Sequence, residues 1–308
     1  MALSIILPTK DRGVVFEKTL EAARLAIQNM PAEIIIINDS KKADLKSFAT
    51  PDNTIKVINN PSSGVASARN LGVKNAKYDT LLFLDDDILI NKSNLLAALD
   101  FALQYPDAAL NINWTYPPEL TEAISITQFG RYLIKHQFTS LKGWRRNTFF
   151  DDTNIFELDY IASYFLFLRK DLFLKVGGYN ESFPHAGAED FEFAYRLKKS
   201  GIKGYCNSLS IVYHNESDRT LLKPWLERKE RSAETRIIAV NMGLSEVEII
   251  SSTFKINFAL FLYHFKNLAY TSLKIIPNIK FFDFLYFRIV NILLALYIFK
   301  GYYKSKRF

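Results

Sequence analysis

The sequence of 308 residues contains one cysteine, Cys206, so it cannot form a disulfide within the chain. A chain without disulfides is typical of a reducing compartment. The first residues also lack a basic leader, and Pro8 interrupts their apolar run, which argues against a signal or transit peptide. Internal repeats and low-complexity linkers are absent from the sequence. These features exclude a disulfide-stapled secreted domain and predict a cytoplasmic protein.

Acidic residues are scarce towards the C-terminal end. Residues 1–218 carry 24 Lys and Arg against 26 Asp and Glu, whereas residues 219–308 carry 15 against 6. The net charge of +7 therefore comes entirely from the last part of the chain. Such asymmetry indicates an anionic partner, either lipid or nucleic acid. We expect a globular domain over residues 1–218 and a basic, aromatic helical region over residues 219–308.

The C-terminal region has no long apolar run free of polar residues. Its longest run, residues 281–299, includes Asp283, Arg288 and Asn291, and a charge at the centre of a bilayer costs about 2.5 to 3.5 kcal/mol. Helices lying on an anionic membrane surface are therefore favoured over a helix that spans it. The cations that would face the headgroups are Lys300, Lys304, Lys306 and Arg307.

Two other interpretations of this region stay open. A helical subdomain could bury its aromatic residues against the core or a second subunit, and the oligomeric state is left undecided. Duplex nucleic acid is the remaining anionic partner, although the membrane surface is preferred and no nucleic-acid partner is expected.

Short apolar runs alternate with amphipathic segments over the first two thirds of the chain. Strands are expected at residues 4–7, 33–37, 54–58, 81–84, 161–168 and 204–213, and helices at 16–29, 65–76, 95–104, 170–176 and 191–199. This alternation predicts right-handed βαβ units and an α/β fold with a central, mostly parallel sheet flanked by helices. Residues 110–160 mix aromatic and charged residues and give no clear pattern.

Three consecutive carboxylates, Asp85, Asp86 and Asp87, follow the apolar run 81–84. A run of this kind is typical of a strand buried on both faces. Adjacent acids repel one another and are almost never buried without a partner. A hard divalent cation, Mg²⁺ or Mn²⁺, would satisfy them. From these residues alone, a solvated acidic turn is the equal alternative.

Polar clusters follow three predicted strands where each one ends, at residues 9–12, 38–40 and 85–87. Ligands of parallel sheets lie beyond the carboxyl ends of the strands, so we expect the three clusters to share one site. Arg69, early in a predicted helix, would either hold a phosphate or pair with an Asp.

Further candidates lie downstream. Glu189 and Asp190 begin a predicted helix, where acids complement the helix dipole or serve as a base. His214 ends a predicted strand and is either a metal ligand or a satisfied histidine. The aromatic candidates for lining a sugar or acceptor cleft, each also a candidate core residue, are Trp114, Tyr116, Trp144 and Tyr164.

Taken in order, these motifs resemble the family 2 glycosyltransferases with the GT-A fold, over about residues 3–215. The pieces that carry the resemblance are Leu-Pro-Thr-Lys-Asp-Arg at residues 7–12, Asn-Asp-Ser at 38–40, the segment 64–72, Leu-Asp-Asp-Asp at 84–87, Gly-Gly-Tyr at 177–179, and Glu-Asp at 189–190 with Arg196 and Gly201 downstream. The C-terminal region has no counterpart in the common core of that family.

The resemblance implies a metal-dependent, inverting transfer of a sugar from a nucleotide-diphospho-sugar, with a UDP-sugar as the expected donor. The implied donor-binding residues are Pro8, Thr9, Asp11 and Arg12 around the nucleotide, Asp39 on the uracil N–H, Arg69 by the diphosphate or the acids, and Asp85 and Asp86 on the ribose and nucleotide. Asp87 would bind Mn²⁺ or Mg²⁺, His214 would add a metal or diphosphate contact, and Asp190 would be the general base. Asn38 stands where relatives often carry Asp, which leaves the base contacts open.

The expected acceptor is a hydroxyl of a glycan or of a lipid-linked, growing cell-envelope polysaccharide, at the inner face of the cell membrane. Two alternatives compete. A nucleotidyltransferase would need a glycine-rich loop after the first strand, but Gly13 is the only glycine in residues 8–13. A non-catalytic membrane-peripheral scaffold would not need its acidic positions occupied, as they are here.

Overall fold

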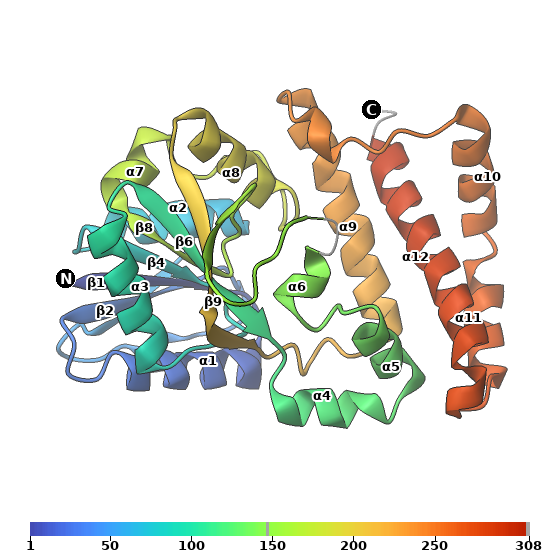
Figure 1. Ribbon diagram of the computed structural model, residues 1–308, viewed down its shortest axis with the longest axis horizontal. Helices are drawn as coiled ribbons and strands as arrows, with labels where there is room; N and C mark the ends of the chain where they lie inside the picture. The colour runs from blue at the N-terminus through green and yellow to red at the C-terminus, as the bar shows by residue number, and fades with distance from the viewer. Residues whose placement is uncertain (146–147, 306–308) are drawn as a thin grey trace. The chain divides into compact units, whose positions relative to one another are not determined.

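The computed structural model describes residues 1–145 and 148–305 (Figure 1). The chain forms two compact units, each of which is described here by itself. The first unit comprises Met1–Pro117, Arg145–Pro184 and Glu189–Glu216, and the second comprises Pro118–Trp144, His185–Ala188 and Ser217–Phe308. The expected boundary between residues 218 and 219 stays a prediction.

The first unit is built on a nine-stranded sheet. The spatial order is β3 (Ile55–Asn59), β2 (Ala32–Asn38), β1 (Leu3–Thr9), β4 (Thr80–Leu84), β8 (Phe165–Arg169), β6 (Ala108–Thr115), β9 (Lys203–His214) and β5 (Ile88–Leu89), while β7 (Ile155–Leu158) also pairs with β9. The strands β1, β2, β3, β4, β6 and β9 run in one direction, and β5, β7 and β8 run in the other. The predicted mostly parallel sheet is confirmed.

Helices cover the sheet. They are α1 (Gly13–Ala26), α2 (Val65–Asn75), α3 (Lys92–Gln104), α7 (Lys170–Lys175) and α8 (Glu189–Lys199). Side chains of α2, α7 and α8 share a core with those of β1, β2 and β4, and α1 lies on the opposite side of the sheet (Figure 1). Every residue of β4 is buried, as the apolar run predicts.

Two predicted strand boundaries were wrong for identifiable reasons. Strand β1 does not end at Leu7 but continues through Pro8 to Thr9. Its pairing with β4 ends at Ile6, so the missing N–H of Pro8 interrupts no ladder on that side. Strand β8 begins only at Phe165, because the Asn111 side chain bonds both the N–H and the carbonyl of Ala162 at 2.9 and 2.7 Å.

The second unit is helical. Its helices are α4 (Pro118–Ser125), α5 (Gln128–Lys135), α6 (Leu141–Trp144), α9 (Leu222–Asn241), α10 (Thr253–Tyr263), α11 (Lys266–Ile275) and α12 (Asp283–Ser305). Ala233 and Ile237 of α9 form a core with Tyr302 and Tyr303 of α12. At Gly301 the two helices approach so closely that an added Cβ would lie 2.2 Å from the carbonyl oxygen of Glu230.

Two polar residues of the long apolar run, Asp283 and Asn291, have partners inside the second unit. Asp283 accepts hydrogen bonds from Arg131 Nε and Nη2, both at 2.7 Å, and Asn291 accepts one from Tyr132 Oη at 2.8 Å. Among the described residues, the helix Lys280–Lys304 is long and apolar enough to cross a membrane, judged by length and composition alone. The predicted headgroup cations Lys306 and Arg307 lie outside the described residues.

Candidate functional site

The acidic triplet, which consists of Asp85, Asp86 and Asp87, lies in the tight connection between β4 and β5. The N–H of Asp85 bonds the carbonyl of Tyr164 at 3.0 Å, and the carbonyl of Asp85 accepts from Ile88 at 3.1 Å. The carbonyl of Asp87 accepts from the N–H of Asn215 at 2.7 Å, which ties the triplet to the end of β9. The backbone therefore fixes where the three carboxylates lie.

Each carboxylate of the triplet meets a donor from another strand end or helix. Asp86 accepts from Thr9 Oγ1 at 2.7 Å, and Asp87 accepts from Arg12 Nη2 at 2.8 Å. Arg69 Nη2 lies 3.0 Å from Asp85. The side chains of Asp86 and Asp87 are only 13% and 4% exposed. The convergence expected for the ends of β1 and β4 is therefore present.

The end of β2 forms an adjoining cluster around Asp39. Its carboxylate accepts from Asn60 Nδ2 at 2.7 Å and from the N–H of Gly64 at 3.1 Å, and Lys10 Nζ lies 3.1 Å away. Gly64 has φ +112°, a conformation that side chains disfavour, so glycine is needed to aim this N–H. The backbone N–H of Asp39 bonds the carbonyl of Thr9 at 2.9 Å, which joins this cluster to the end of β1.

Three other predicted or neighbouring positions complete this edge. Pro8 lies buried within β1. Asp11, at φ 53°, accepts from Ser40 Oγ at 2.5 Å. The Asn38 side chain points to protein partners, the carbonyl of Ala43 at 2.8 Å and Asn59 Oδ1 at 3.0 Å. The polar side chain of Asn38 is thus hydrogen-bonded within the fold.

Arg69 joins the acidic triplet to the start of α8. Besides Asp85, its guanidinium lies 3.1 Å from Glu189 and 3.4 Å from Asp190. Its side chain is 3% exposed. Burial lowers the pKa of Arg69, but the charges of Asp190, Asp85 and Glu189 outweigh this, so its pKa lies above the ordinary value. Of the two alternatives for Arg69, the structure has the pairing with acids.

Asp190 is the more accessible of the two acids at the start of α8. Its side chain is 22% exposed, against 2% for Glu189. Ser163 Oγ donates to Asp190 Oδ1 at 2.7 Å, and the N–H of Ser163 donates to Oδ2 at 3.2 Å. The carboxylate is thereby held in one orientation with an edge open. Ser163 was not among the predicted residues.

Asp87, His214 and Glu216 form a buried group that can hold a metal ion. Each offers one ligand atom, and the three atoms lie within 4.8 Å of one another. His214 Nε2 is 3.3 Å from Asp87 Oδ1 and 4.0 Å from Glu216 Oε1. Two carboxylate oxygens and one imidazole nitrogen fit Mn²⁺ well and Mg²⁺ through the oxygens. Glu216 was not predicted from the sequence, although its place two residues beyond the His214 strand end was the available signal.

Burial shifts the pKa values of His214 and of the neighbouring Asp85 and Asp86. Burial and the charge of Asp87 raise the pKa of Asp86 to about 7, and burial also raises the pKa of Asp85. For His214, burial lowers the pKa, but Asp87 and Glu216 outweigh it and the net shift is upward. Like charges held this close are what a divalent cation would neutralise.

The two tryptophans among the candidates have different settings. Trp114 is 1% exposed, and its ring meets the His214 ring edge-on with centroids 4.8 Å apart. It therefore packs behind the histidine. Trp144 belongs to the second unit, where it is 48% exposed and Lys229 Nζ lies 5.3 Å from its ring.

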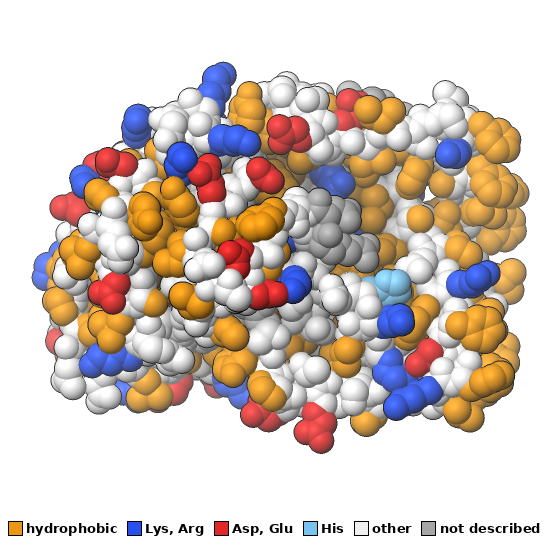
Figure 2. Space-filling model, viewed as in Figure 1, with side chains coloured by type: hydrophobic (Ala, Val, Ile, Leu, Met, Phe, Trp, Pro, Cys, Tyr) orange, Lys and Arg blue, Asp and Glu red, His pale blue; other side chains and the backbone are white. Residues whose placement is uncertain are grey.

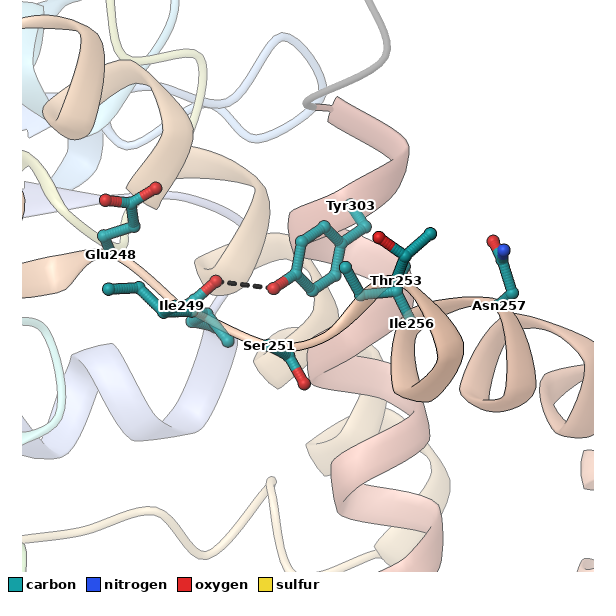
Figure 3. A pocket seen from close by; sticks show the side chains of 8 residues that line it. Glu248, Ile249, Ser251, Thr253, Ile256, Asn257 and Tyr303 are labelled. Atoms are coloured by element: carbon teal, nitrogen blue, oxygen red, sulfur yellow. Dashed lines mark hydrogen bonds between the residues drawn. The ribbon is translucent and has the colours of Figure 1, made fainter.

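A separate hollow lies in the second unit, near the start of α10 (Figure 3). Its lining is Glu248, Ile249, Ile250, Ser251, Thr253, Ile256, Asn257 and Tyr303. Tyr303 Oη donates to the carbonyl of Ile249 at 2.6 Å along one side. The hollow shares no residue with the group Asp87, His214 and Glu216. Glu248 is the only carboxylate among its described lining residues, so the hollow offers no set of metal ligands.

Comparison with solved structures identifies the fold. The chain is similar to the crystal structure of GalNAc-T7 with UDP, GalNAc and Mn²⁺, with a TM-score of 0.52 at 17% identity over 69% of this chain and 43% of that one. This likeness concerns the fold alone. Together with the observed sheet and helices, it confirms the predicted GT-A fold.

Comparison of sequences identifies the family. The model of glycosyl transferase family 2 matches residues 4–173, and the chain belongs to this family. It is 29% identical over 241 residues to a chondroitin synthase of Pasteurella multocida strain Pm70, and 26% identical over 240 residues to a hyaluronan synthase of Pasteurella multocida. Each match covers 70% of this chain but 25% of the relative, so the chain spans about a quarter of their length. The predicted family, and with it the predicted enzyme class, is confirmed.

Proposed function

We propose that the protein is a metal-dependent, inverting glycosyltransferase that moves a sugar from a UDP-sugar to a hydroxyl of a glycan or lipid-linked acceptor. The observation that carries this proposal is the group Asp87, His214 and Glu216 at the carboxyl edge of the sheet. Asp190 lies close to the same edge through the shared partner Arg69. A solved relative in fold contains UDP and Mn²⁺, which supports the choice of donor and metal.

Asp87, His214 and Glu216 would hold the cation, and Asp85 and Asp86 would contact the nucleotide. When bound, Mn²⁺ or Mg²⁺ would neutralise the charge of the diphosphate leaving group. Thr9, Arg12 and Asp39 would line the nucleotide pocket, together with Pro8 and Asp11. Because Arg12 pairs with Asp87, it would also set the orientation of that carboxylate.

Asp190 would take the proton from the attacking acceptor hydroxyl. The hydrogen bonds from Ser163 direct its carboxylate, and Arg69 lies 3.4 Å from the same group. Attack from the face opposite the leaving group inverts the anomeric carbon, and no covalent sugar intermediate is required. Ser163 and Arg69 are therefore positioning residues.

The acceptor is proposed to be a growing bacterial cell-surface polysaccharide at the inner face of the cell membrane. Relatives named as chondroitin and hyaluronan synthases support a polysaccharide acceptor. The long apolar helix in the second unit and the basic charge of residues 219–308 support a membrane setting.

Titration calorimetry with UDP and Mn²⁺ tests the metal and donor together. We expect UDP binding that requires Mn²⁺ and weakens at least about 10-fold in Asp87→Asn and Glu216→Gln, because each loses a charged ligand. Asp107→Asn, at an exposed position of the same unit, is the matched control and should bind as the wild type does. Equal UDP affinity with and without Mn²⁺ would refute the metal site. The absence of any UDP binding would favour the alternative of a non-catalytic scaffold.

The general base is tested by Asp190→Asn. We expect transfer to fall by about 10² to 10⁴-fold, while Mn²⁺-dependent UDP binding persists because the metal group is untouched. The assay is product formation across a panel of UDP-sugars with oligosaccharide acceptors. Wild-type turnover in this variant would exclude Asp190 as the base.

A further inference from the structure

Helices α10 and α11 and the turn between them carry a row of exposed apolar side chains, which we call the phenylalanine row. Its members are Phe254, Phe258, Phe261, Phe265 and Leu268. In α10, Phe254, Phe258 and Phe261 follow one another at steps of four and three residues, the spacing of one helix face. Phe265 lies in the turn before α11, and Leu268 lies in α11. Their exposed fractions run from 51% for Phe258 to 78% for Phe254. Figure 2 shows hydrophobic side chains gathered along the edge where Figure 1 has α10 and α11.

Four rings of the row lie against one another in two pairs. Those of Phe254 and Phe258 are parallel, with centroids 6.1 Å apart, and those of Phe261 and Phe265 meet edge-on at 5.2 Å. Exposed apolar residues scattered singly are normal on a protein surface, but a contiguous row is a sign of an interaction site.

The second unit does not need this row for its own core. The inward faces of α10 and α11 already supply those contacts: Tyr263 packs on Tyr297 of α12 at 5.2 Å, and Tyr270 Oη bonds Tyr297 Oη at 3.0 Å. Ile256 also packs against the core that α9 and α12 share. Helix α10 is therefore apolar on both faces although none of its residues is fully buried. Such a helix is typical of a surface that becomes covered.

The charge of the segment that carries the row favours one kind of partner. Asp283 is the only acid between residues 249 and 305, and Arg131 neutralises it through two hydrogen bonds. The basic residues over the same span are Lys255, Lys266, Lys274, Lys280, Arg288, Lys300 and Lys304. The apolar row is thus accompanied by cations whose acidic counterparts are absent from this segment.

We propose that the phenylalanine row inserts into the interface of an anionic lipid membrane. Phenyl rings would enter the headgroup boundary by about 5 to 10 Å, and the lysines would meet the lipid phosphates. A second copy of this chain is the weaker occupant, because it would bring equally cationic surfaces together and like charges across an interface repel. The proposal deepens the membrane setting of the proposed function and rests on it.

Vesicle co-sedimentation tests the proposal on the full chain. We expect at least about tenfold stronger binding to vesicles of phosphatidylcholine with 30% phosphatidylglycerol than to phosphatidylcholine alone, and weaker binding in high salt. The double variant Phe258→Ser/Phe261→Ser should lose at least about tenfold in binding. The matched control is Leu174→Ser/Leu209→Ser in the first unit, which removes side chains that are 59% and 69% exposed and should bind like the wild type. Equal binding by the row variant and the wild type would overturn the proposal.

The depth of insertion can be measured directly, because the only cysteine, Cys206, is buried and a new thiol can be labelled selectively. An environment-sensitive nitrobenzoxadiazole label at Phe261→Cys should brighten and shift to the blue with anionic vesicles. The same label at Leu174→Cys, where the native side chain is almost equally exposed, should not respond. Identical responses at both sites would contradict insertion of the row.

Two measurements separate this proposal from the proposed reaction and from self-association. Mn²⁺-dependent UDP binding without vesicles should be unchanged in Phe258→Ser/Phe261→Ser, so loss of vesicle binding with intact UDP binding supports the membrane surface. Light scattering of the wild type should give a monomer mass that the row variant shares. An oligomer that the row variant abolishes, without vesicle binding, would assign the row to a second copy instead.

Discussion

The two units of this chain treat charge in opposite ways. In the first unit, carboxylates are brought together and buried, and two arginines from distant segments, Arg12 and Arg69, bind them. In the second unit, the segment 249–305 keeps many cations and a single acid, and it leaves large aromatic side chains in contact with solvent.

The acidic site of the first unit needs fixed geometry, whereas the apolar, basic surface of the second unit needs only area and charge to bind a partner. Buried charges need fixed partners because the interior solvates them poorly, so the acidic group is ordered by hydrogen bonds before any ligand arrives. An apolar surface needs only area and nearby charge of the right sign.

Arg69→Met should have the largest effect. It removes the shared cation of Asp85, Glu189 and Asp190 while keeping an apolar side chain of similar length, and uncompensated buried charge costs about 3 to 5 kcal/mol. Chemical denaturation of the full chain measures the loss. The control is Arg24→Met, because Arg24 and Glu21 form an exposed pair that should contribute little. Equal stability of both variants would show that Arg69 is not needed to hold the acids.

Gly301→Ala should destabilise the second unit by about 1 to 3 kcal/mol, because the new methyl group collides with the carbonyl of Glu230 and must push α12 from α9. Calorimetry should show the transition of the second unit moving to lower temperature, with UDP binding kept. Ala295→Ser, at an exposed position of α12, is the control and should leave that transition in place. An unshifted transition in Gly301→Ala would mean that α9 and α12 do not pack this closely.

Arg131→Met should cost about 1 to 2 kcal/mol, less than Arg69→Met. Its partner Asp283 keeps 15% of its side chain exposed, so water can replace part of the lost contact. The variant also removes a positive charge and leaves Asp283 unneutralised, so binding to anionic vesicles should weaken. Stability loss as large as that of Arg69→Met would remove the contrast between the units.

The smallest effect should come from pH. Burial raises the pKa of Glu33, but hydrogen bonds from Lys56, Ser4 Oγ and the N–H of Lys77 outweigh it, so the folded pKa lies below the ordinary 4.5. This stabilisation is complete above pH 4.5 and is lost as the pH falls through the folded pKa. Glu33→Gln should therefore be less stable than the wild type at pH 7, and the difference should shrink in acid. A difference independent of pH would rule out this linkage.

Strands and helices with a strong period were predictable from sequence, as was the clustering at the ends of β1, β2 and β4. The periodicity of apolar residues carries no information on which distant residues come into contact. For this reason the antiparallel direction of β8 and the contact of Arg69 with Glu189 could not be predicted. Strand β6 was not predicted because Asn111 and Asn113 interrupt its apolar pattern. In the structure Asn111 is buried, and its Nδ2 donates hydrogen bonds to the carbonyls of Ala162 and Phe165. Glu216 was not predicted because its place just after a strand end is only a weak signal, and the fold alone brings it close to Asp87.

The contact between Arg69 and Glu189 spans 120 positions of the chain. At a synthesis rate of about 5 to 20 residues per second, Arg69 is synthesised roughly 6 to 24 seconds before its partner. Late in that interval the residues of strands β1 to β4 have been made, but those of α8, which carries Glu189 and Asp190, have not. Assembly of the candidate site is therefore a late event in the life of the nascent chain, and truncated products that end before α8 would carry Asp85, Asp86 and Asp87 without Asp190.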